Sequence, residues 1–198
     1  MKKIVYLLFF LGAVWQLSSR TSLVSFGPGV MAKEEPYQAV IGSPATYWVD
    51  DYTITELADF RIRAKVLSKT NYYWDRGADL SPTDLALGWG NMSDESILEG
   101  IEISQSARFF RWRVESFPIP LREIETHSAN MHLIPANDTV KVDIQTVRKG
   151  DIVEISGSLV KVASTIEDWN WESSLTRNDT GKGACELIWV NSIQIVPP

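Results

Sequence analysis

Cys185 and His127 are the two residues of this sequence whose chemistry could form a catalytic pair. A cysteine thiolate is a strong nucleophile and an imidazole can take its proton, so the pair would suit transpeptidation or amide hydrolysis. On an extended segment, however, Cys185 shares one face with Leu187 and Trp189, where a cysteine behaves as a small buried apolar residue. The sequence favours this packing role and leaves the enzyme with Cys185 and His127 as the alternative.

The order of these two residues is similar to that of sortase-like enzymes, which are β-barrels with a histidine upstream of a cysteine on a late strand. Those enzymes also place an arginine shortly after the cysteine. Here no Lys or Arg follows Cys185, and Arg177 precedes it. The resemblance therefore supports the catalytic alternative in outline only.

The two histidines, His127 and His132, are also candidates for metal ligands. Residues five apart lie on opposite faces of a strand and about 140° apart on a helix, so only a loop would bring both imidazoles to one ion. The nearest acidic residues, Glu123 and Glu125, are typical of a solvated helical turn. We therefore expect a polar corner at residues 127–132, with Met131 packed inward, and neither a metal site nor another cofactor.

Trp169 and Trp171 stand two residues apart, which places them on one face of a strand. Exposed aromatic rings beside carboxylates can hold sugar rings, although a small core also needs large apolar side chains. Arg177 opens a glycine-containing turn whose backbone amides could bind an anion, and a plain hairpin connection explains the same turn. The candidate ligand-binding residues are therefore Trp169, Trp171 and Arg177.

The charge of the chain argues against nucleic acid as a partner. The sequence carries 25 Asp and Glu against 19 Lys and Arg. Without Lys2, Lys3 and Arg20, 16 basic residues remain and the net charge is about −9. Nucleic acids and anionic lipid surfaces bind basic proteins, so the mixture of basic and aromatic residues at 108–113 is better explained as an amphipathic strand.

Residues 1–20 are predicted to be a signal-anchor. Lys2 and Lys3 precede a charge-free run at residues 4–17, and Arg20 follows it. The run would be about 21 Å long as a helix against a bilayer core of roughly 30 Å, and snorkelling of Arg20 would extend it. No clean small-x-small cleavage site follows, so a cleaved signal peptide is the alternative. The early positive charge predicts a single-pass membrane protein with its C-terminal part outside the cytoplasm, or a secreted or periplasmic protein after cleavage.

The remaining chain is predicted to be an extended tether at residues 21–46 and one domain at residues 47–198, because Gly and Pro interrupt the first part. Apolar and charged residues alternate at 58–66, which predicts a strand. Further strands are expected at 101–115, 140–144, 152–162 and 184–196, with a bulge near Asn191, and short helices at 93–100 and 121–125. This set predicts a mainly β fold after an N-terminal apolar helix: a small closed or partly closed β-barrel, oligonucleotide-binding-like or SH3-like, with one or two short helices.

Several phrases of the sequence resemble a group of uncharacterised bacterial proteins with an N-terminal membrane segment. They lie at residues 27–30, 85–90 with 92–94, 127–132, 171–174 and 183–186. The resemblance covers most of the chain; it implies a location in the cell envelope and assigns no catalytic residue. We therefore expect a membrane-tethered or exported binding or assembly module of the cell envelope, whose partner is an envelope protein or a glycan.

Overall fold

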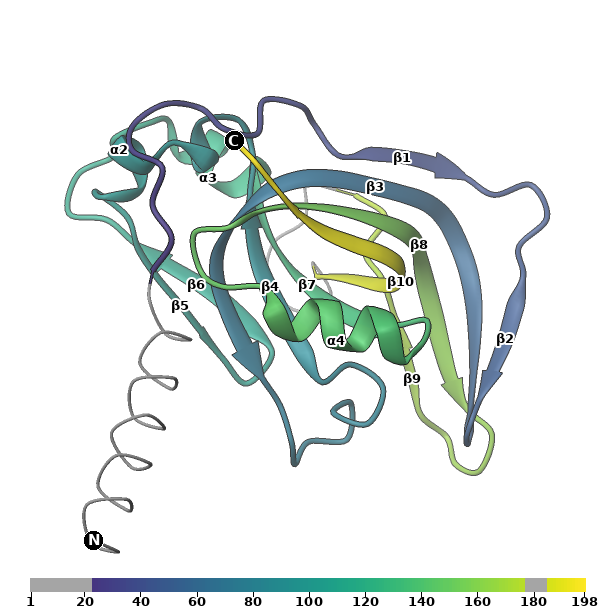
Figure 1. Cartoon of the computed structure of the whole chain (residues 1–198). Coiled ribbons are helices and arrows are strands. Elements are labelled where there is room, and N and C mark those ends of the chain that lie inside the picture. Colours follow the sequence, from purple (N-terminus) through teal and green to yellow (C-terminus); the bar gives the residue numbers. More distant parts are fainter. Residues whose placement is uncertain (1–22, 177–184) are drawn as a thin grey trace, which may run out of the picture.

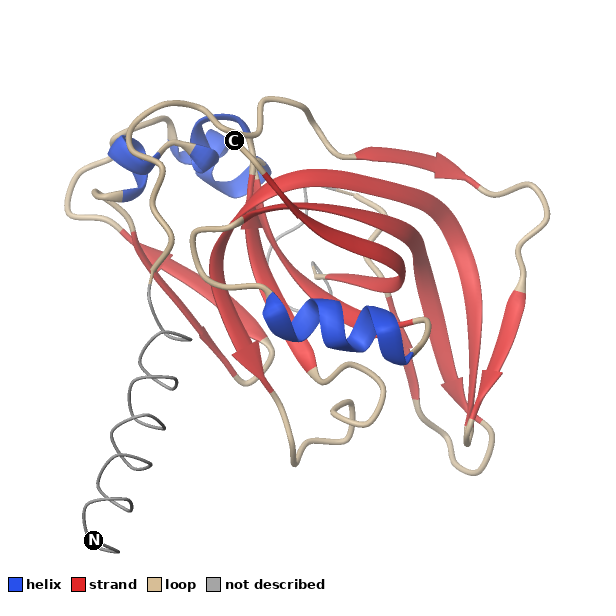
Figure 2. Cartoon of the chain, in the orientation of Figure 1, coloured by secondary structure: helices blue, strands red, loops and turns tan. Residues whose placement is uncertain are grey.

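The computed structural model describes residues 23–176 and 185–198 of the chain. The expected signal-anchor at residues 1–20 and the turn that begins at Arg177 lie outside the described residues. Within the two described ranges, no helix is both long enough and apolar enough to cross a membrane. The fold is mainly β, as the sequence predicts (Figures 1 and 2).

Five strands form a ring of hydrogen-bonded neighbours. In ring order they are β3 (Tyr52–Asn71), β4 (Thr83–Gly88), β7 (Ser128–Pro135), β10 (Glu186–Val196) and β8 (Ile152–Ser164), and β8 pairs again with β3. All neighbours are antiparallel except β7 and β10, which are parallel. Figure 1 shows β3 bending strongly, which lets it pair with β8 along residues 52–65 and with β4 along residues 65–71.

The strand expected at residues 58–66 is confirmed within β3. Phe60 and Ile62 are buried, whereas Arg61 is exposed on the opposite face. Lys65 departs from the expected charged face because it is buried, and its ammonium group lies 2.8 Å from the carboxylate of Glu95. The alternation therefore predicts which side chains are buried in this strand, except for Lys65, which is buried beside the partly exposed Glu95.

The apolar core fills the inside of the ring. Its buried side chains come from all five ring strands and from helix α4 (Asp138–Thr146), and they include Phe60, Leu87, Met131, Ile155, Ile188 and Val140. Met131 points inward, as expected. The segment around it is a strand, β7, and not the polar corner that the sequence suggested.

Helix α4 replaces the strand expected at residues 140–144, and that prediction is wrong. The side chain of Asn137 accepts a hydrogen bond from the backbone of Val140 at 3.0 Å, which caps the first turn. Val140 and Ile144 are four residues apart and share the buried face of the helix, whereas Val142 is exposed. The alternation of apolar residues at 140, 142 and 144 is therefore incidental.

The single strand expected at residues 101–115 is a hairpin. β5 (Glu102–Ser106) and β6 (Phe109–Arg113) pair with each other as a separate two-stranded sheet. Ala107 and Arg108 connect them with positive φ angles of 49° and 67°. Gly or Asn usually occupies such a turn, so the sequence carries no signal for it.

The other expected elements are confirmed with changed bounds. The helical segment at 93–100 contains η1 (Gly90–Ser93) and α2 (Glu95–Leu98), and the turn at 121–125 is α3 (Leu121–Thr126). The strands expected at 152–162 and 184–196 are β8 and β10, and the latter shifts its register between Val190 and Ser192. Short β9 (Asn170–Glu172) continues the sheet beside β8.

The segment expected as a tether is extended, but it lies against the ring. β1 (Tyr37–Val40) lies within this segment and pairs with β3, and β2 (Thr46–Val49), which begins at its last residue, also pairs with β3. The backbone N–H of Val24 donates to the turn before β8 at 3.1 Å, and Ala32 is buried in the core. The prediction missed these contacts because they join segments far apart in the sequence.

Candidate functional site

The outer face of β4, β7 and β10 carries a group of buried polar side chains. The register pairs Asp84 of β4 with His132 of β7, so both project from the same face. Asn130 lies two residues before His132 and shares that face. Leu187 pairs with His132 from the other side, which places Cys185 beside Asn130. Residues distant in the sequence therefore meet on one surface.

Asp84 is the centre of this group, which we call the Asp84 cluster: Asp84, His132, Asn130, Arg108 and Cys185. One carboxylate oxygen of Asp84 lies 2.9 Å from Nδ1 of His132, and the other accepts a hydrogen bond from Nη1 of Arg108 at 2.8 Å. The contact with His132 is short, although its direction is not that of a hydrogen bond. Asp84 is completely buried, and a carboxylate in such a place requires charged or polar partners.

Arg108 joins the β5–β6 turn to the outer face. Its guanidinium donates at 2.8 Å to Asp75, to Asp84 and to the backbone carbonyl of Ser81. The same group lies 3.9 Å from the centroid of the Tyr72 ring. Every nitrogen of the guanidinium is thus engaged within the described residues, so Arg108 fastens the hairpin and is not a free cation for a ligand.

Trp169 and Trp171 cover the Asp84 cluster. The centroid of the Trp171 ring lies 4.7 Å from that of His132, and the guanidinium of Arg108 lies 5.6 Å from Trp171. Trp169 meets Trp171 edge to face at 6.3 Å and carries Arg76 over its ring at 4.9 Å. Both rings are partly buried. The two tryptophans therefore lie together at the Asp84 cluster, and part of each ring packs against other side chains of the protein.

Two loops meet at the edge of the Asp84 cluster. They are residues 72–82, which connect β3 and β4, and residues 165–169, which connect β8 and β9. Arg76 of the first loop forms an ion pair with Glu167 of the second. Trp74, in the first loop, has 97% of its surface exposed. A large aromatic ring is thus held in solvent next to the covered cluster.

His127 belongs to a different contact. Its Nε2 lies 3.0 Å from one carboxylate oxygen of Glu35, and the other oxygen accepts a hydrogen bond from Nε1 of Trp89 at 3.0 Å. His127 therefore helps to hold the N-terminal segment against the ring. Among the described atoms, no hydrogen bond joins His127 to Cys185.

Cys185 lies at the edge of the Asp84 cluster. Its Sγ is 4.0 Å from Nδ2 of Asn130 and 4.0 Å from the backbone carbonyl of Arg108, and the residue is partly buried. The histidine on the same face is His132. The structure thus associates Cys185 with a different histidine from the one that the sequence suggested.

The residues considered as metal ligands do not converge. His127 and His132 have different carboxylate partners, Glu35 and Asp84. Glu123 accepts a hydrogen bond from Asn91 at 2.7 Å. Within residues 23–176 and 185–198, no three His, Cys, Asp or Glu side chains are arranged to hold a metal ion.

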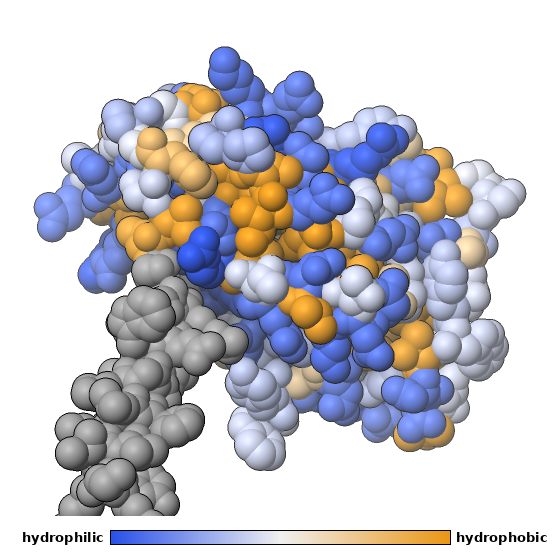
Figure 3. Space-filling model, viewed as in Figure 1, coloured by the Kyte–Doolittle hydropathy of each residue, from blue (hydrophilic) through white to orange (hydrophobic). Residues whose placement is uncertain are grey.

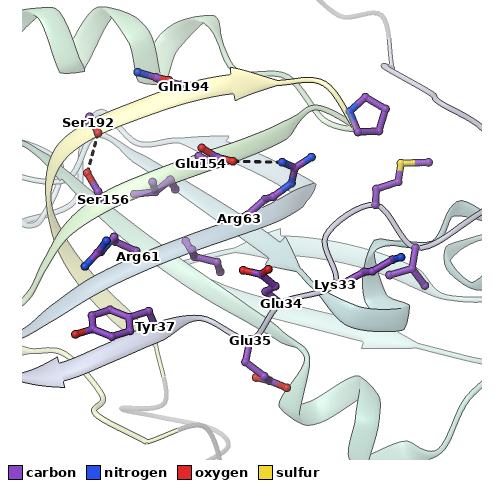
Figure 4. A pocket seen from close by; sticks show the side chains of 15 residues that line it. Lys33, Glu34, Glu35, Tyr37, Arg61, Arg63, Glu154, Ser156, Ser192 and Gln194 are labelled. Atoms are coloured by element: carbon purple, nitrogen blue, oxygen red, sulfur yellow. Dashed lines mark hydrogen bonds and ion pairs between the residues drawn. The ribbon is translucent and has the colours of Figure 1, made fainter.

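An open groove of about 1090 Å³ lies between the N-terminal segment and the strands β3, β8 and β10 (Figure 4). Arg63 and Glu154 on its floor form an ion pair at 3.3 Å, and the hydroxyls of Ser156 and Ser192 are 2.8 Å apart. Glu34 enters from the N-terminal side. The groove is lined by both acidic and basic side chains, and some of them pair with each other. It therefore favours neither anionic nor cationic ligands.

Sequence reasoning did not single out Asp84, Asn130 or Arg108 as parts of one site. The sequence contained one signal for this site, the single aspartate in the otherwise uncharged strand β4. Every residue of β4 is buried, so the carboxylate of Asp84 needs a buried polar or charged partner. Comparison with protein-family models, with curated proteins and with solved structures finds no match to this chain. The functional assignment therefore rests on the geometry of the site.

Proposed function

We propose that this protein is a membrane-tethered or exported binding module of the cell envelope. Lys2 and Lys3 before the charge-free run at residues 4–17 support attachment or export through the N-terminus, with the folded part outside the cytoplasm. The resemblance to bacterial proteins with an N-terminal membrane segment supports the same location.

We also propose that the five-stranded ring is a small closed β-barrel of the oligonucleotide-binding type. In sequence order its strands are β3, β4, β7, β8 and β10. The first strand, β3, pairs with the second, β4, and with the fourth, β8. The third strand, β7, is parallel to the fifth, β10. Barrels of this type bind oligosaccharides or oligonucleotides on the second and third strands and on the loops after the first and fourth. Here those parts are the outer face of β4 and β7, loop 72–82 and residues 165–169 after β8, which lie around the Asp84 cluster.

A glycan is the ligand that this surface favours. The observation that carries the proposal is the exposure of Trp74, 97%, and of Tyr73, 73%, beside the cluster. Exposed rings with neighbouring carboxylates, here Asp75 and Glu167, suit sugars, whose faces are apolar and whose hydroxyls donate hydrogen bonds. The net charge of about −9 after removal of the N-terminal segment disfavours nucleic acid.

Co-sedimentation of the full-length protein in detergent micelles with purified cell-wall glycan tests this proposal. We expect Trp74→Ala to weaken binding roughly tenfold, since one stacked ring contributes on the order of 1 kcal/mol or more. Phe117→Ala is the matched control, because Phe117 is 57% exposed but precedes α3, outside the two loops. Failure of the parent to bind glycan, or equal binding by Trp74→Ala, would contradict the glycan proposal.

The N-terminal attachment has its own test. Cell fractionation and intact-mass measurement are expected to find the chain in membranes with residues 1–20 retained. A soluble protein that begins after Ser19 would contradict the membrane-tethered form and support the exported form.

A Cys-His transpeptidase or amidase acting on cell-wall peptide is a second candidate function. The observation in its favour is that Cys185 shares a face with His132, whose Nδ1 lies 2.9 Å from Asp84. A catalytic triad has a carboxylate, an imidazole and a nucleophile in this order, although here the Asp84–His132 contact lacks the direction of a hydrogen bond. Prompt reaction of Cys185 with an alkylating reagent in the folded protein would favour this function over the binding module.

A further inference from the structure

Residues 24–32 form a strap that is fastened to the start of α2. The carboxylate of Glu95 accepts hydrogen bonds from the hydroxyl of Ser25 at 2.5 Å and from the backbone of Phe26 and Gly27 at 2.9 and 3.0 Å. Lys65 lies 2.8 Å from the same carboxylate and neutralises it. One partly buried ion pair thus holds three successive residues of the strap.

Further contacts hold the rest of the strap in place. Asp94 accepts a hydrogen bond from the backbone of Gly29 at 2.9 Å, and the hydroxyl of Ser93 accepts one from Ala32 at 3.0 Å. At the other end, Val24 is bonded to the turn before β8. The position of the first described residues, next to Leu23, is therefore set by many contacts.

A mostly apolar groove of about 300 Å³ lies beside this exit. Its apolar walls are Leu23 and Val24 of the strap, Leu67 of β3, Leu98 of α2, and Ile101 and Ile103 at β5. Four charged residues also line the groove: Lys65, Glu95, Glu99 and Lys149. Leu23 is 63% exposed and Phe26 is 42% exposed. Figure 3 shows hydrophobic side chains gathered close to where the described chain meets the grey residues. Removing this apolar surface from water is favourable, so a partner that covers it gains free energy.

The length of the preceding chain limits how far this groove can be from a bilayer. The apolar run ends at Leu17, and only residues 18–22 separate it from Leu23. Even a fully extended chain covers about 20 Å over that interval. If the run is embedded, as the proposed tether requires, the groove lies within that distance of the membrane surface.

We propose that this face of the domain rests on the bilayer and that the groove receives acyl chains of membrane lipids. This inference rests on the membrane-tethered form of the proposed function. The contact is apolar and not electrostatic, because the folded part carries a net charge of about −9 and anionic headgroups repel it. Neutral lipid is therefore sufficient, and anionic lipid adds nothing.

Spin labels on the full-length chain in phosphatidylcholine vesicles test the contact. The single native cysteine is replaced by Cys185→Ser, and one label is placed through Leu98→Cys in the groove. Val142→Cys is the matched control, since Val142 is 58% exposed on α4. We expect oxygen to relax the label at position 98 more than a water-soluble nickel complex does, and the reverse at position 142. Ile103→Cys serves as a second groove position if the first variant does not fold.

Each outcome of this test has a separate meaning. A water-exposed label at position 98 in a vesicle-bound chain overturns the lipid contact and leaves the tether standing. A chain that does not remain with the vesicles overturns both. Spin–spin broadening at position 98 would show a second copy of the chain in the groove and would also overturn the lipid contact.

Discussion

Asp84 and His132 face each other across β4 and β7, with 2.9 Å between Oδ2 and Nδ1, and both side chains are almost completely buried. Arg108 approaches the other oxygen of the same carboxylate at 2.8 Å. The carboxylate of Asp84 on β4 therefore contacts both the neighbouring strand β7 and the turn between β5 and β6.

We expect Asp84→Ala to lower the free energy of unfolding by about 1–3 kcal/mol, because Arg108 would lose one charged partner and keep Asp75. The double variant Asp84→Ala/Arg108→Ala should cost less than the sum of the two single variants, since the same ion pair is lost in each of them. Urea unfolding of the four proteins measures this coupling. Strict additivity would show that the two residues do not act together.

The inside of the ring predicts a contrast between two adjacent residues of β3. Phe60 is fully buried, so Phe60→Ala should cost roughly 3–5 kcal/mol through lost burial and a cavity. Arg61 is exposed and lies over the ring of Tyr37 at 4.8 Å, so Arg61→Ala should cost about 1 kcal/mol or less. Thermal or urea unfolding compares the two, and equal losses would reject the assignment of faces.

The strap predicts a pH dependence of stability that is centred on Glu95. Burial raises the pKa of this carboxyl, but hydrogen bonds from Lys65, Ser25 and the backbone of Phe26 and Gly27 outweigh burial and lower the pKa from 4.5 to about 2. Because the folded pKa is the lower one, the ionised group stabilises the fold above pH 4.5, and this contribution is lost as pH falls from 4.5 through 2.

Glu95→Gln should therefore be less stable than the parent at pH 7 by about 1–3 kcal/mol, the range for hydrogen bonds to a charged group. The gap should close as the pH is lowered, which unfolding measured across the acid range detects. Glu99→Gln is the control, because Glu99 is exposed at the end of the same helix. A gap that is independent of pH would mean that ionised Glu95 does not hold the strap.

Cys185 distinguishes the two candidate functions. If it is a packing residue, Cys185→Ala should keep the function of the protein and lower its stability on the order of 1 kcal/mol. A nucleophile behaves in the opposite way, since its removal abolishes function and leaves stability nearly intact. Complementation of a deletion strain and the thermal midpoint together measure both effects. Loss of complementation by a variant that melts like the parent would favour the enzyme.

The sequence by itself determined the elements whose conformation depends on near neighbours in the chain. Alternation at residues 58–66 identified the central part of β3, and the change of phase near Asn191 identified the irregularity of β10. Gly157 of β8 is required for a long-range reason, because a Cβ there would lie 2.0 Å from the carbonyl oxygen of Trp189. Local signals failed at residues 140–144, where one pattern fits both a strand and a helix face.

Only the tertiary structure decided the candidate site. Asp84, Arg108 and His132 come from β4, a hairpin turn and β7, and no spacing in the sequence links them. Their meeting depends on pairing register, and a shift of one residue would turn each side chain of a strand to the opposite face. The same reason explains why His127 lies with Glu35 and why Cys185 lies near Asn130. Register is set by hydrogen bonds between distant strands, so these contacts exist only once the ring has closed.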